Sequence, residues 1–214
     1  MANNKFRSGC AKLKELYKNH FLLVFTLCLI KLAPALLLSL VNPYVSAQLE
    51  NIESNSLLVG LALSMNTISV FMTCMFFGYY SEWSYFGRNA TITFGIVTTA
   101  GSSMLIGIAE SYAVFFIILS VSGVGAAATM CCAYSIILDA IPGHLLVLAL
   151  AHMEFFEAVG WTVGPLLFGT ILTSKKKVFY PFLAVGLVQL TIAIYSCVVM
   201  FFQLKPVRKK AREF

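Results

Sequence analysis

Long apolar stretches alternate with short polar segments along almost the whole chain. A helix needs roughly 20 apolar residues to cross a bilayer, and six of the stretches are long enough. Because backbone polar groups in hydrocarbon must be hydrogen-bonded within their own segment, each stretch is predicted to be α-helical. The predicted spans are residues 21–47, 56–80, 89–109, 112–138, 145–173 and 178–203. The pattern therefore predicts an all-α membrane protein with six transmembrane helices in one bundle.

The segments between the predicted spans are short, so we expect helices that follow one another in the sequence to pack as antiparallel neighbours. Before the first span, Leu13, Leu16 and Tyr17 recur at helical spacing among lysines. This pattern is typical of a basic amphipathic helix on a membrane surface. The chain is accordingly divided into a cytoplasmic amphipathic N-terminus (1–20), the six-helix bundle (21–203) and a basic cytoplasmic tail (204–214).

The composition supports a membrane protein and argues against other classes. Of the residues, 59% are hydrophobic and 11% are charged, whereas a soluble domain carries about 25% charged residues. These values exclude an ordinary soluble enzyme, a disordered chain and a soluble nucleic-acid-binding protein. The 6 cysteines show no CxxC spacing, and no HExxH, GxSxG or Walker motif occurs. We therefore expect no metal site, no cofactor and no enzymatic activity.

The positive charges are concentrated outside the predicted spans. Five Lys and Arg residues precede the first span and five follow the last one. With both termini inside, Arg88 brings the cytoplasmic total to eleven, against the three lysines at 175–177 on the opposite side. Because Lys and Arg are enriched on the cytoplasmic side of membranes, we predict a multi-pass protein with both termini in the cytoplasm, in contact with anionic lipid headgroups.

Lys31 lies within the first predicted span, near the middle of the bilayer. An ionisable group at this depth is costly and normally faces a cavity or a counter-charge. Pro34 lacks the N–H that would bind the Ile30 carbonyl oxygen, which predicts a kink and a polar pocket beside the amine. We interpret Lys31 as a substrate or coupling residue. The alternative is an amine with a purely structural partner.

Glu154 and Glu157 lie three residues apart in the fifth span and hence on one helical face. Two carboxylates in a low-dielectric environment repel each other, so one of them is expected to hold a proton near neutral pH. A proton-coupled transporter needs such a group. Lys31 is the obvious candidate for a cation beside the two acids. A structural lysine–glutamate pair without a role in transport is the alternative.

Two glycine-containing segments complete the candidate features. Glycines four residues apart in the fifth span let two helices approach closely, and a proline adds a bend. The residues of this glycine-proline motif are Gly160, Gly164, Pro165 and Gly169. After the second span, the sequence predicts a charge-locked cytoplasmic turn over residues 82–88. The residues of that turn motif are Gly78, Glu82, Gly87 and Arg88.

The order of these features resembles the N-terminal six-helix half of a major facilitator superfamily transporter. The turn motif is similar to the superfamily's signature between helices two and three, and residues 160–169 are similar to the helix-five signature of its proton antiporters. Residues 153–157, followed by the glycine-proline motif, resemble the vesicular amine and polyamine transporter branch. The resemblance covers roughly residues 20–203. It implies secondary transport of a small organic solute by alternating access, coupled to protons.

The resemblance also implies roles for individual parts of the chain. Helices one and four would line the path, helices two and five would meet the other half of the transporter, and helices three and six would face lipid. Lys31 would contact the substrate or a counter-charge, and Glu154 and Glu157 would carry protons or pair with Lys31. The turn motif would gate the cytoplasmic side.

Among the departures of the chain from this family pattern, two bear on the solute and on the assembly. Vesicular monoamine carriers have an acid in helix one, where this chain has Lys31. That difference leaves room for an anionic solute, or for a Lys31 that is neutralised by Glu154 or Glu157. The superfamily has twelve helices in two halves with the substrate site between them, whereas six are predicted here. The open possibilities are a fragment, a homodimer with a second copy, and a non-transporting half that pairs with or regulates a full-length transporter.

Overall fold

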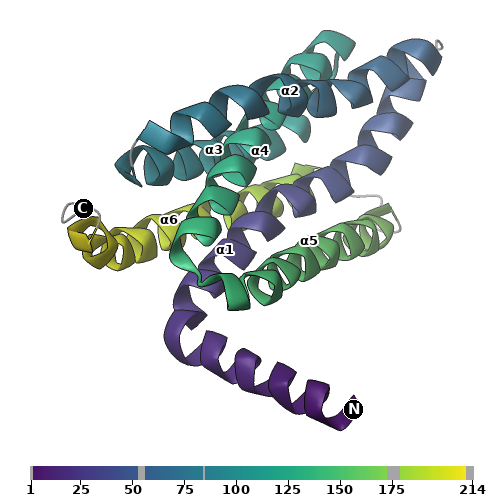
Figure 1. Cartoon of the computed structure of the whole chain (residues 1–214). Coiled ribbons are helices and arrows are strands. Elements are labelled where there is room, and N and C mark those ends of the chain that lie inside the picture. Colours follow the sequence, from purple (N-terminus) through teal and green to yellow (C-terminus); the bar gives the residue numbers. More distant parts are fainter. Residues whose placement is uncertain (1, 53–55, 84, 173–178, 211–214) are drawn as a thin grey trace.

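The computed structural model describes residues 2–52, 56–83, 85–172 and 179–210, and these residues form six helices (Figure 1). The helices are α1 (Ala2–Ile52), α2 (Ser56–Trp83), α3 (Tyr85–Ile106), α4 (Tyr112–Ala140), α5 (Gly143–Leu172) and α6 (Phe179–Lys210). Their order follows the six predicted stretches. The all-helical fold class is therefore confirmed for the described part of the chain.

Three helices differ most in extent from the prediction. α1 begins at Ala2, so the basic N-terminal segment and the first span form one continuous helix, which bends where it joins the bundle (Figure 1). α6 continues to Lys210, beyond the predicted end at residue 203. α3 ends at Ile106, just before Gly107, because glycine readily adopts the backbone conformations that end a helix.

Five helices in the described ranges are long and apolar enough to cross a membrane. Their candidate spans are His20–Ser46, Leu57–Tyr79, Tyr112–Ala140, Gly143–Leu166 and Phe182–Met200. α3 is not among them, and its threonine and serine residues account for its lower hydropathy. The chain is therefore a multi-pass helical protein, and a membrane crossing by α3 stays a prediction.

The threonine and serine side chains of α3 are hydrogen-bonded within the helix. Six hydroxyl groups donate to backbone carbonyl oxygens three or four residues earlier. They belong to Thr91, Thr93, Thr98, Thr99, Ser102 and Ser103. A hydroxyl that is hydrogen-bonded in this way costs much less in an apolar environment than an unpaired one. The composition of α3 is thus compatible with a place inside the bundle.

The predicted charged turn over residues 82–88 is wrong in its boundaries. α2 extends to Trp83 and α3 begins at Tyr85, so Gly87 and Arg88 lie in the first turn of a helix. Glu82 lies in the last turn of α2, and its side chain is outside the described part of the structure. The helices can extend farther than expected because the segment contains no proline, the residue that most strongly disfavours a helix.

A proline separates α4 from α5. Ile141 has an extended backbone (φ −109°, ψ 131°), because a following proline disfavours the helical conformation. The Pro142 carbonyl oxygen then accepts hydrogen bonds from the backbone N–H groups of Leu145 and Leu146, at 2.9 and 3.1 Å. These bonds open α5 two residues earlier than predicted.

Helices that are distant in the sequence make most of the contacts. α1 packs mainly on α5, α2 packs on α4, and α3 packs on both α4 and α6. The expectation that helices adjacent in the sequence pack on each other holds for α3 and α4, whereas the other successive pairs make few contacts. Short connections bring helix ends together, but they do not decide which faces meet.

Glycine positions explain which faces meet. A Cβ atom added to Gly123 of α4 would collide with the backbone of Asn66 in α2, and one added to Gly125 would collide with Thr98 of α3. A Cβ atom on Gly186 of α6 would lie 2.6 Å from Met104 Cγ of α3. Helices in a membrane associate where small residues let their backbones approach. The glycines of α4 and α6 therefore select α2 and α3 as partners.

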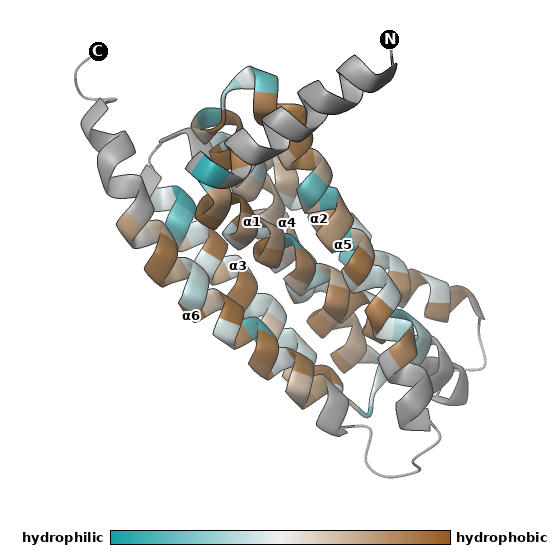
Figure 2. Ribbon diagram, turned by 90° about the horizontal axis from the view of Figure 1, so that it is seen from below, coloured by the Kyte–Doolittle hydropathy of each residue, from teal (hydrophilic) through white to brown (hydrophobic). Residues whose placement is uncertain are grey.

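The buried apolar side chains form two clusters along α1, one around Leu27 and Ile30 and the other around Leu37 and Leu40. Lys31 lies close to the boundary between them. Apolar residues recur along the lengths of the helices (Figure 2). α2 and α5 expose large apolar side chains that are each at least 64% exposed: Phe71, Met72, Met75, Phe76, Val147, Phe155 and Leu166.

Candidate functional site

Lys31 is buried in the bundle and paired with a carboxylate of α5. Its side chain is only 3% exposed, and its Nζ atom contacts Oε2 of Glu157, which is 19% exposed. A buried charge is costly unless it is paired and hydrogen-bonded. This ion pair accounts for the presence of an amine in the middle of an apolar stretch of α1.

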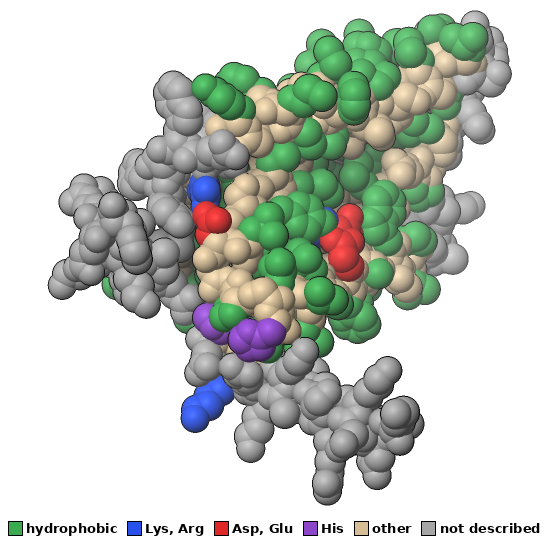
Figure 3. Space-filling model, in the orientation of Figure 1, with side chains coloured by type: hydrophobic (Ala, Val, Ile, Leu, Met, Phe, Trp, Pro, Cys, Tyr) green, Lys and Arg blue, Asp and Glu red, His purple; other side chains and the backbone are tan. Residues whose placement is uncertain are grey.

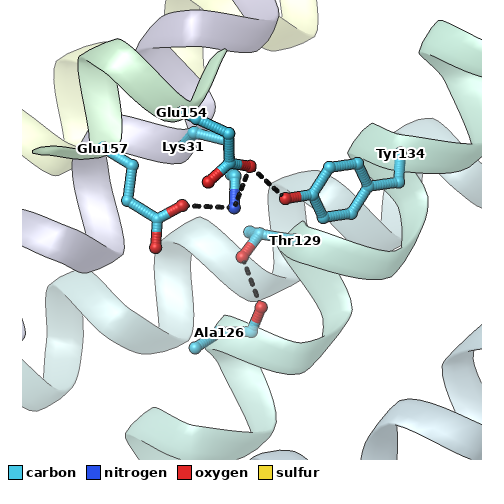
Figure 4. A network of polar contacts seen from close by, with 6 residues as sticks. All are labelled: Lys31, Ala126, Thr129, Tyr134, Glu154 and Glu157. Carbon is cyan, nitrogen blue, oxygen red and sulfur yellow. Dashed lines mark hydrogen bonds and ion pairs between the residues drawn. The ribbon is translucent and has the colours of Figure 1, made fainter. Parts of the chain in front are cut away.

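A second carboxylate lies beside the same amine (Figure 4). Oε1 of Glu154 is 3.6 Å from Lys31 Nζ, and the Glu154 side chain is 57% exposed. Glu154 and Glu157 are three residues apart on α5, so both project toward α1 from one face of the helix. The structure thus brings together the three residues that the sequence selected as substrate or coupling residues.

Tyr134 of α4 completes this group, and sequence reasoning missed it. Its hydroxyl donates a hydrogen bond of 2.5 Å to Oε1 of Glu154, and Lys31 Nζ lies 4.7 Å from the centroid of its ring. A cation over an aromatic ring is attracted by the ring's negative face. A tyrosine in an apolar helix can contact lipid or form a buried hydrogen bond, so nothing in the sequence singled out Tyr134. We refer to Lys31, Glu154, Glu157 and Tyr134 as the Lys31 cluster.

A close crossing of α1 and α5 holds the amine against the two acids. A Cβ atom on Gly160 would lie 2.8 Å from Ala35 Cβ, and one on Gly164 would overlap the Ser39 side chain. The Ser39 hydroxyl also donates a hydrogen bond of 3.0 Å to the Gly160 carbonyl oxygen. The contacts advance in the same direction along both helices, so α1 and α5 run parallel here. The helix-five glycines are therefore the packing surface that positions the cluster.

The charges of the Lys31 cluster do not balance within the cluster. Two carboxylates face one amine, so the fully ionised cluster has a net charge of −1. A proton or a cationic group would neutralise the surplus charge. On the face shown in Figure 3, acidic and basic side chains meet at two separate places within an otherwise mainly apolar or neutral surface. The arrangement can hold a proton or bind a charged solute.

The rest of the glycine-proline motif lies farther along α5. Pro165 lies on the exposed side of α5 and does not end the helix. Gly169 belongs to the part of α5 whose side chains and surroundings are not described. Of the four residues of the motif, Gly160 and Gly164 are therefore the two with described contacts to α1.

Arg88, from the predicted turn motif, pairs with α4. Its Nη1 atom lies 2.5 Å from Oδ2 of Asp139, and the Arg88 side chain is 10% exposed. This ion pair joins the start of α3 to the end of α4. In the same motif, Gly78 faces open space at its Cβ position, and the surroundings of Glu82 lie outside the described side chains. Sequence reasoning had not selected Asp139 as a partner.

A small cavity of about 50 Å³ lies between α1 and α5, one helical turn from Lys31. It is lined by Leu16, Phe21, Val24, Phe25, Cys28, His152 and Phe156. The lining is almost entirely apolar. Among the described side chains, no group of three or more His, Cys, Asp or Glu residues is arranged to hold a metal ion.

Comparison with known proteins identifies the family of the chain. No curated protein matches the sequence significantly. The family model of the Major Facilitator Superfamily matches residues 23–214, which is most of the chain. Members of this superfamily are membrane transporters and not enzymes. Several apolar helices in the structure agree with that assignment. The chain belongs to the Major Facilitator Superfamily, a family of transporters, and is a multi-pass membrane protein.

Proposed function

We propose that this protein moves a small organic solute by alternating access and couples the movement to protons through the Lys31 cluster. The observation that carries the proposal is one amine and two carboxylates gathered between α1, α4 and α5 inside an apolar bundle. Ionisable groups at membrane depth are costly, and in transporters they mark substrate and proton pathways. A purely structural pair would need only one carboxylate.

The unequal surroundings of the two acids support proton coupling. Glu157 contacts the buried amine, whereas the Glu154 side chain is 57% exposed. A carboxylate that is open on one side exchanges a proton with water whenever a wet pathway reaches it. The surplus negative charge of the cluster then favours uptake of that proton or of another cation.

We infer that the solute carries a positive charge. Lys31 is neutralised by Glu157, so the amine does not by itself recruit an anion. The remaining charge of the cluster is negative, and it complements an amine or another cationic group. The resemblance to the vesicular amine and polyamine branch points in the same direction.

The Arg88–Asp139 ion pair is our candidate for part of the cytoplasmic gate, together with Gly78, Glu82 and Gly87. α4 carries both Asp139 and Tyr134. A movement of α4 that breaks the ion pair would therefore also displace a member of the Lys31 cluster. This connection would let the gate and the proton site respond to each other.

A flux assay on the full chain in proteoliposomes tests the proposal. Radiolabelled spermidine and serotonin serve as cationic probes, succinate serves as an anionic probe, and the vesicles are acidic inside. We expect uptake of a cationic probe that an uncoupler abolishes and that Lys31→Met strongly reduces. Glu110→Gln, which changes an exposed acid between α3 and α4, is the matched control. Uptake that is insensitive to the pH gradient, or no uptake of any probe, contradicts the proposal.

The alternative function is a protein that does not transport but pairs with or regulates a full-length transporter. The apolar faces of α2 and α5 favour it, because exposed apolar surface of this kind suits contact with another protein as well as with lipid. Co-purification of a full-length superfamily member with the tagged chain, combined with no flux through the chain alone, would support this alternative. Flux through the purified chain alone would exclude it.

A further inference from the structure

We propose that the two acids of the Lys31 cluster have different roles, a division of duties that depends on Tyr134 as the positioning residue. Glu157 remains ionised as the counter-charge of Lys31, and Glu154 is the carboxylate that exchanges protons. This inference rests on the proposed transport function and adds the division of labour within the site. It assigns a role to Tyr134 that the sequence did not reveal.

The first step of the argument concerns Glu157. Its Oε2 atom contacts Lys31 Nζ, and both side chains are mostly shielded from solvent. Separating these charges would leave a buried amine without its main partner, which is strongly unfavourable. The close crossing of α1 and α5 at Gly160 also fixes the spacing between the two helices at this level. Glu157 is therefore held in the ion pair.

The second step concerns Glu154. Its carboxylate is 3.6 Å from the same amine, beyond hydrogen-bond distance, and it is the most exposed member of the ion-paired group. The groups that face it are Lys31 from α1, Tyr134 from α4 and Glu157 on its own helix. With Lys31 already matched by Glu157, the surplus negative charge belongs to the exposed carboxylate.

The third step concerns Tyr134. Its hydroxyl donates to Oε1 of Glu154, which is the same oxygen atom that lies nearest to Lys31. This oxygen is therefore shared between a hydrogen bond from Tyr134 and the longer of the two ion pairs that Lys31 makes. By holding this oxygen in a hydrogen bond, Tyr134 keeps Glu154 in the longer of the two ion pairs, and its own ring lies against the amine.

The same hydrogen bond links two helices that otherwise touch little. α4 packs mainly on α2 and α3, and α5 packs mainly on α1. A hydroxyl donates more strongly to an ionised carboxylate than to a neutral one. Protonation of Glu154 therefore weakens a link between α4 and α5, so the state of the carboxylate is communicated to the position of α4.

A labelling experiment tests the division of duties without a known solute. Dicyclohexylcarbodiimide reacts with protonated carboxyl groups in apolar surroundings, and peptide mass spectrometry locates the product. The full chain in liposomes is labelled between pH 5 and pH 9. We expect Glu154 to be labelled several-fold more than Glu157, with labelling that falls as the pH rises. Equal labelling of the two acids, or preferential labelling of Glu157, overturns the proposal.

Two tyrosine variants test the positioning role. Tyr134→Phe removes the hydrogen bond that favours the ionised carboxylate, so Glu154 should be labelled more strongly at each pH tested. Tyr112→Phe is the matched control, because Tyr112 is also on α4 but its hydroxyl donates to the Leu58 carbonyl oxygen. Unchanged labelling of Glu154 in Tyr134→Phe, or the same increase in Tyr112→Phe, refutes the role of Tyr134.

The labelling result and the flux result are independent. Preferential labelling of Glu154 without any flux supports the division of duties and contradicts the proposed transport. Proton-coupled flux with equal labelling of both acids supports transport and refutes the division. Glu154→Gln gives a further readout, because flux in this variant should lose its dependence on the pH gradient while Glu110→Gln keeps it.

Discussion

Ser39 on α1 and Gly160 on α5 are joined by a hydrogen bond in which the serine hydroxyl donates to the glycine carbonyl oxygen at 3.0 Å. The same hydroxyl also reaches the Leu36 carbonyl oxygen of its own helix at 3.0 Å. The contact lies two helical turns from Lys31, in the stretch where Gly160 and Gly164 let the two helices approach closely. It therefore fixes the register in which the amine meets the acids of α5.

Ser39→Ala should weaken the crossing only slightly. Hydrogen bonds between membrane helices contribute on average about 0.6 kcal/mol, so the thermal unfolding temperature in detergent should fall by a small but measurable amount. Ser64→Ala is the matched control, because the Ser64 hydroxyl bonds only within α2, to Gly60, in the described contacts. A larger fall in the unfolding temperature for Ser64→Ala than for Ser39→Ala would contradict the contact between Ser39 and Gly160.

Gly164→Ala should have a much larger effect. The added Cβ atom would overlap the Ser39 side chain, and overpacking of this kind costs about 1–3 kcal/mol. The control is Gly60→Ala on α2, where nothing lies within 4 Å of the new atom. Thermal unfolding should show a clear loss for Gly164→Ala and none for Gly60→Ala. The double variant Gly164→Ala with Ser39→Gly should recover part of the loss, and no recovery would argue against a direct clash.

Lys31 and Glu157 should show strong coupling in a double-mutant cycle. Lys31→Met leaves two carboxylates without their amine, and Glu157→Gln leaves the amine without its contact partner. Breaking a buried ion pair costs roughly 3–5 kcal/mol, and the partial exposure of Glu157 places the expected loss at about 2 kcal/mol. The double variant should be more stable than the sum of the single losses predicts. If the losses in free energy of unfolding of the two single variants add up to that of the double variant, the two residues do not interact.

Asp139→Asn should destabilise the junction of α3 and α4. It removes the charge that binds Arg88, a cation whose side chain is only 10% exposed. We expect a loss of about 1–2 kcal/mol, below the range for a fully buried pair because Asp139 is itself 42% exposed. Glu110→Gln again serves as the control. The charge-swapped variant Arg88→Asp with Asp139→Arg should restore part of the free energy of unfolding that Asp139→Asn loses. A lower free energy of unfolding than in Asp139→Asn would contradict a direct pair.

The orientation of the chain in the membrane is a separate prediction. The excess of Lys and Arg outside the spans places both termini in the cytoplasm. Epitope tags at either end should therefore be reached by antibody only after the membrane is permeabilised. A tag inserted at residues 175–177 should be reached without permeabilisation. Exposure of a terminal tag on intact cells would reverse the predicted topology.

The sequence predicted the helices and the charged members of the site for the same reason. An apolar stretch of about 20 residues has few structural alternatives, and a charge inside it is so costly that it must have a partner. Lys31, Glu154 and Glu157 were therefore recognisable without coordinates. Their mutual contact was one of the alternatives that the residues left open.

The order of helix packing and the role of Tyr134 were not predictable in this way. Which helices meet depends on where glycines on two distant segments face each other, as Gly160 does with Ala35. A single sequence shows the glycines but not the facing surface. A tyrosine in an apolar helix is equally compatible with lipid contact and with a buried hydrogen bond, so only the fold distinguished Tyr134 from the others. The Arg88–Asp139 pair was missed because Arg88 was expected in a turn over residues 82–88, whereas α3 already begins at Tyr85.

The apolar surface of α2 and α5 has a practical consequence for any measurement on this protein. The six helices by themselves leave Met72, Met75 and Phe155 uncovered, so much of the hydrophobic stabilisation of these two helices comes from whatever medium surrounds them. Unfolding temperatures will therefore vary with detergent chain length and with nanodisc lipid, even for an unchanged sequence. Only variants compared in one and the same amphiphile report on the protein itself.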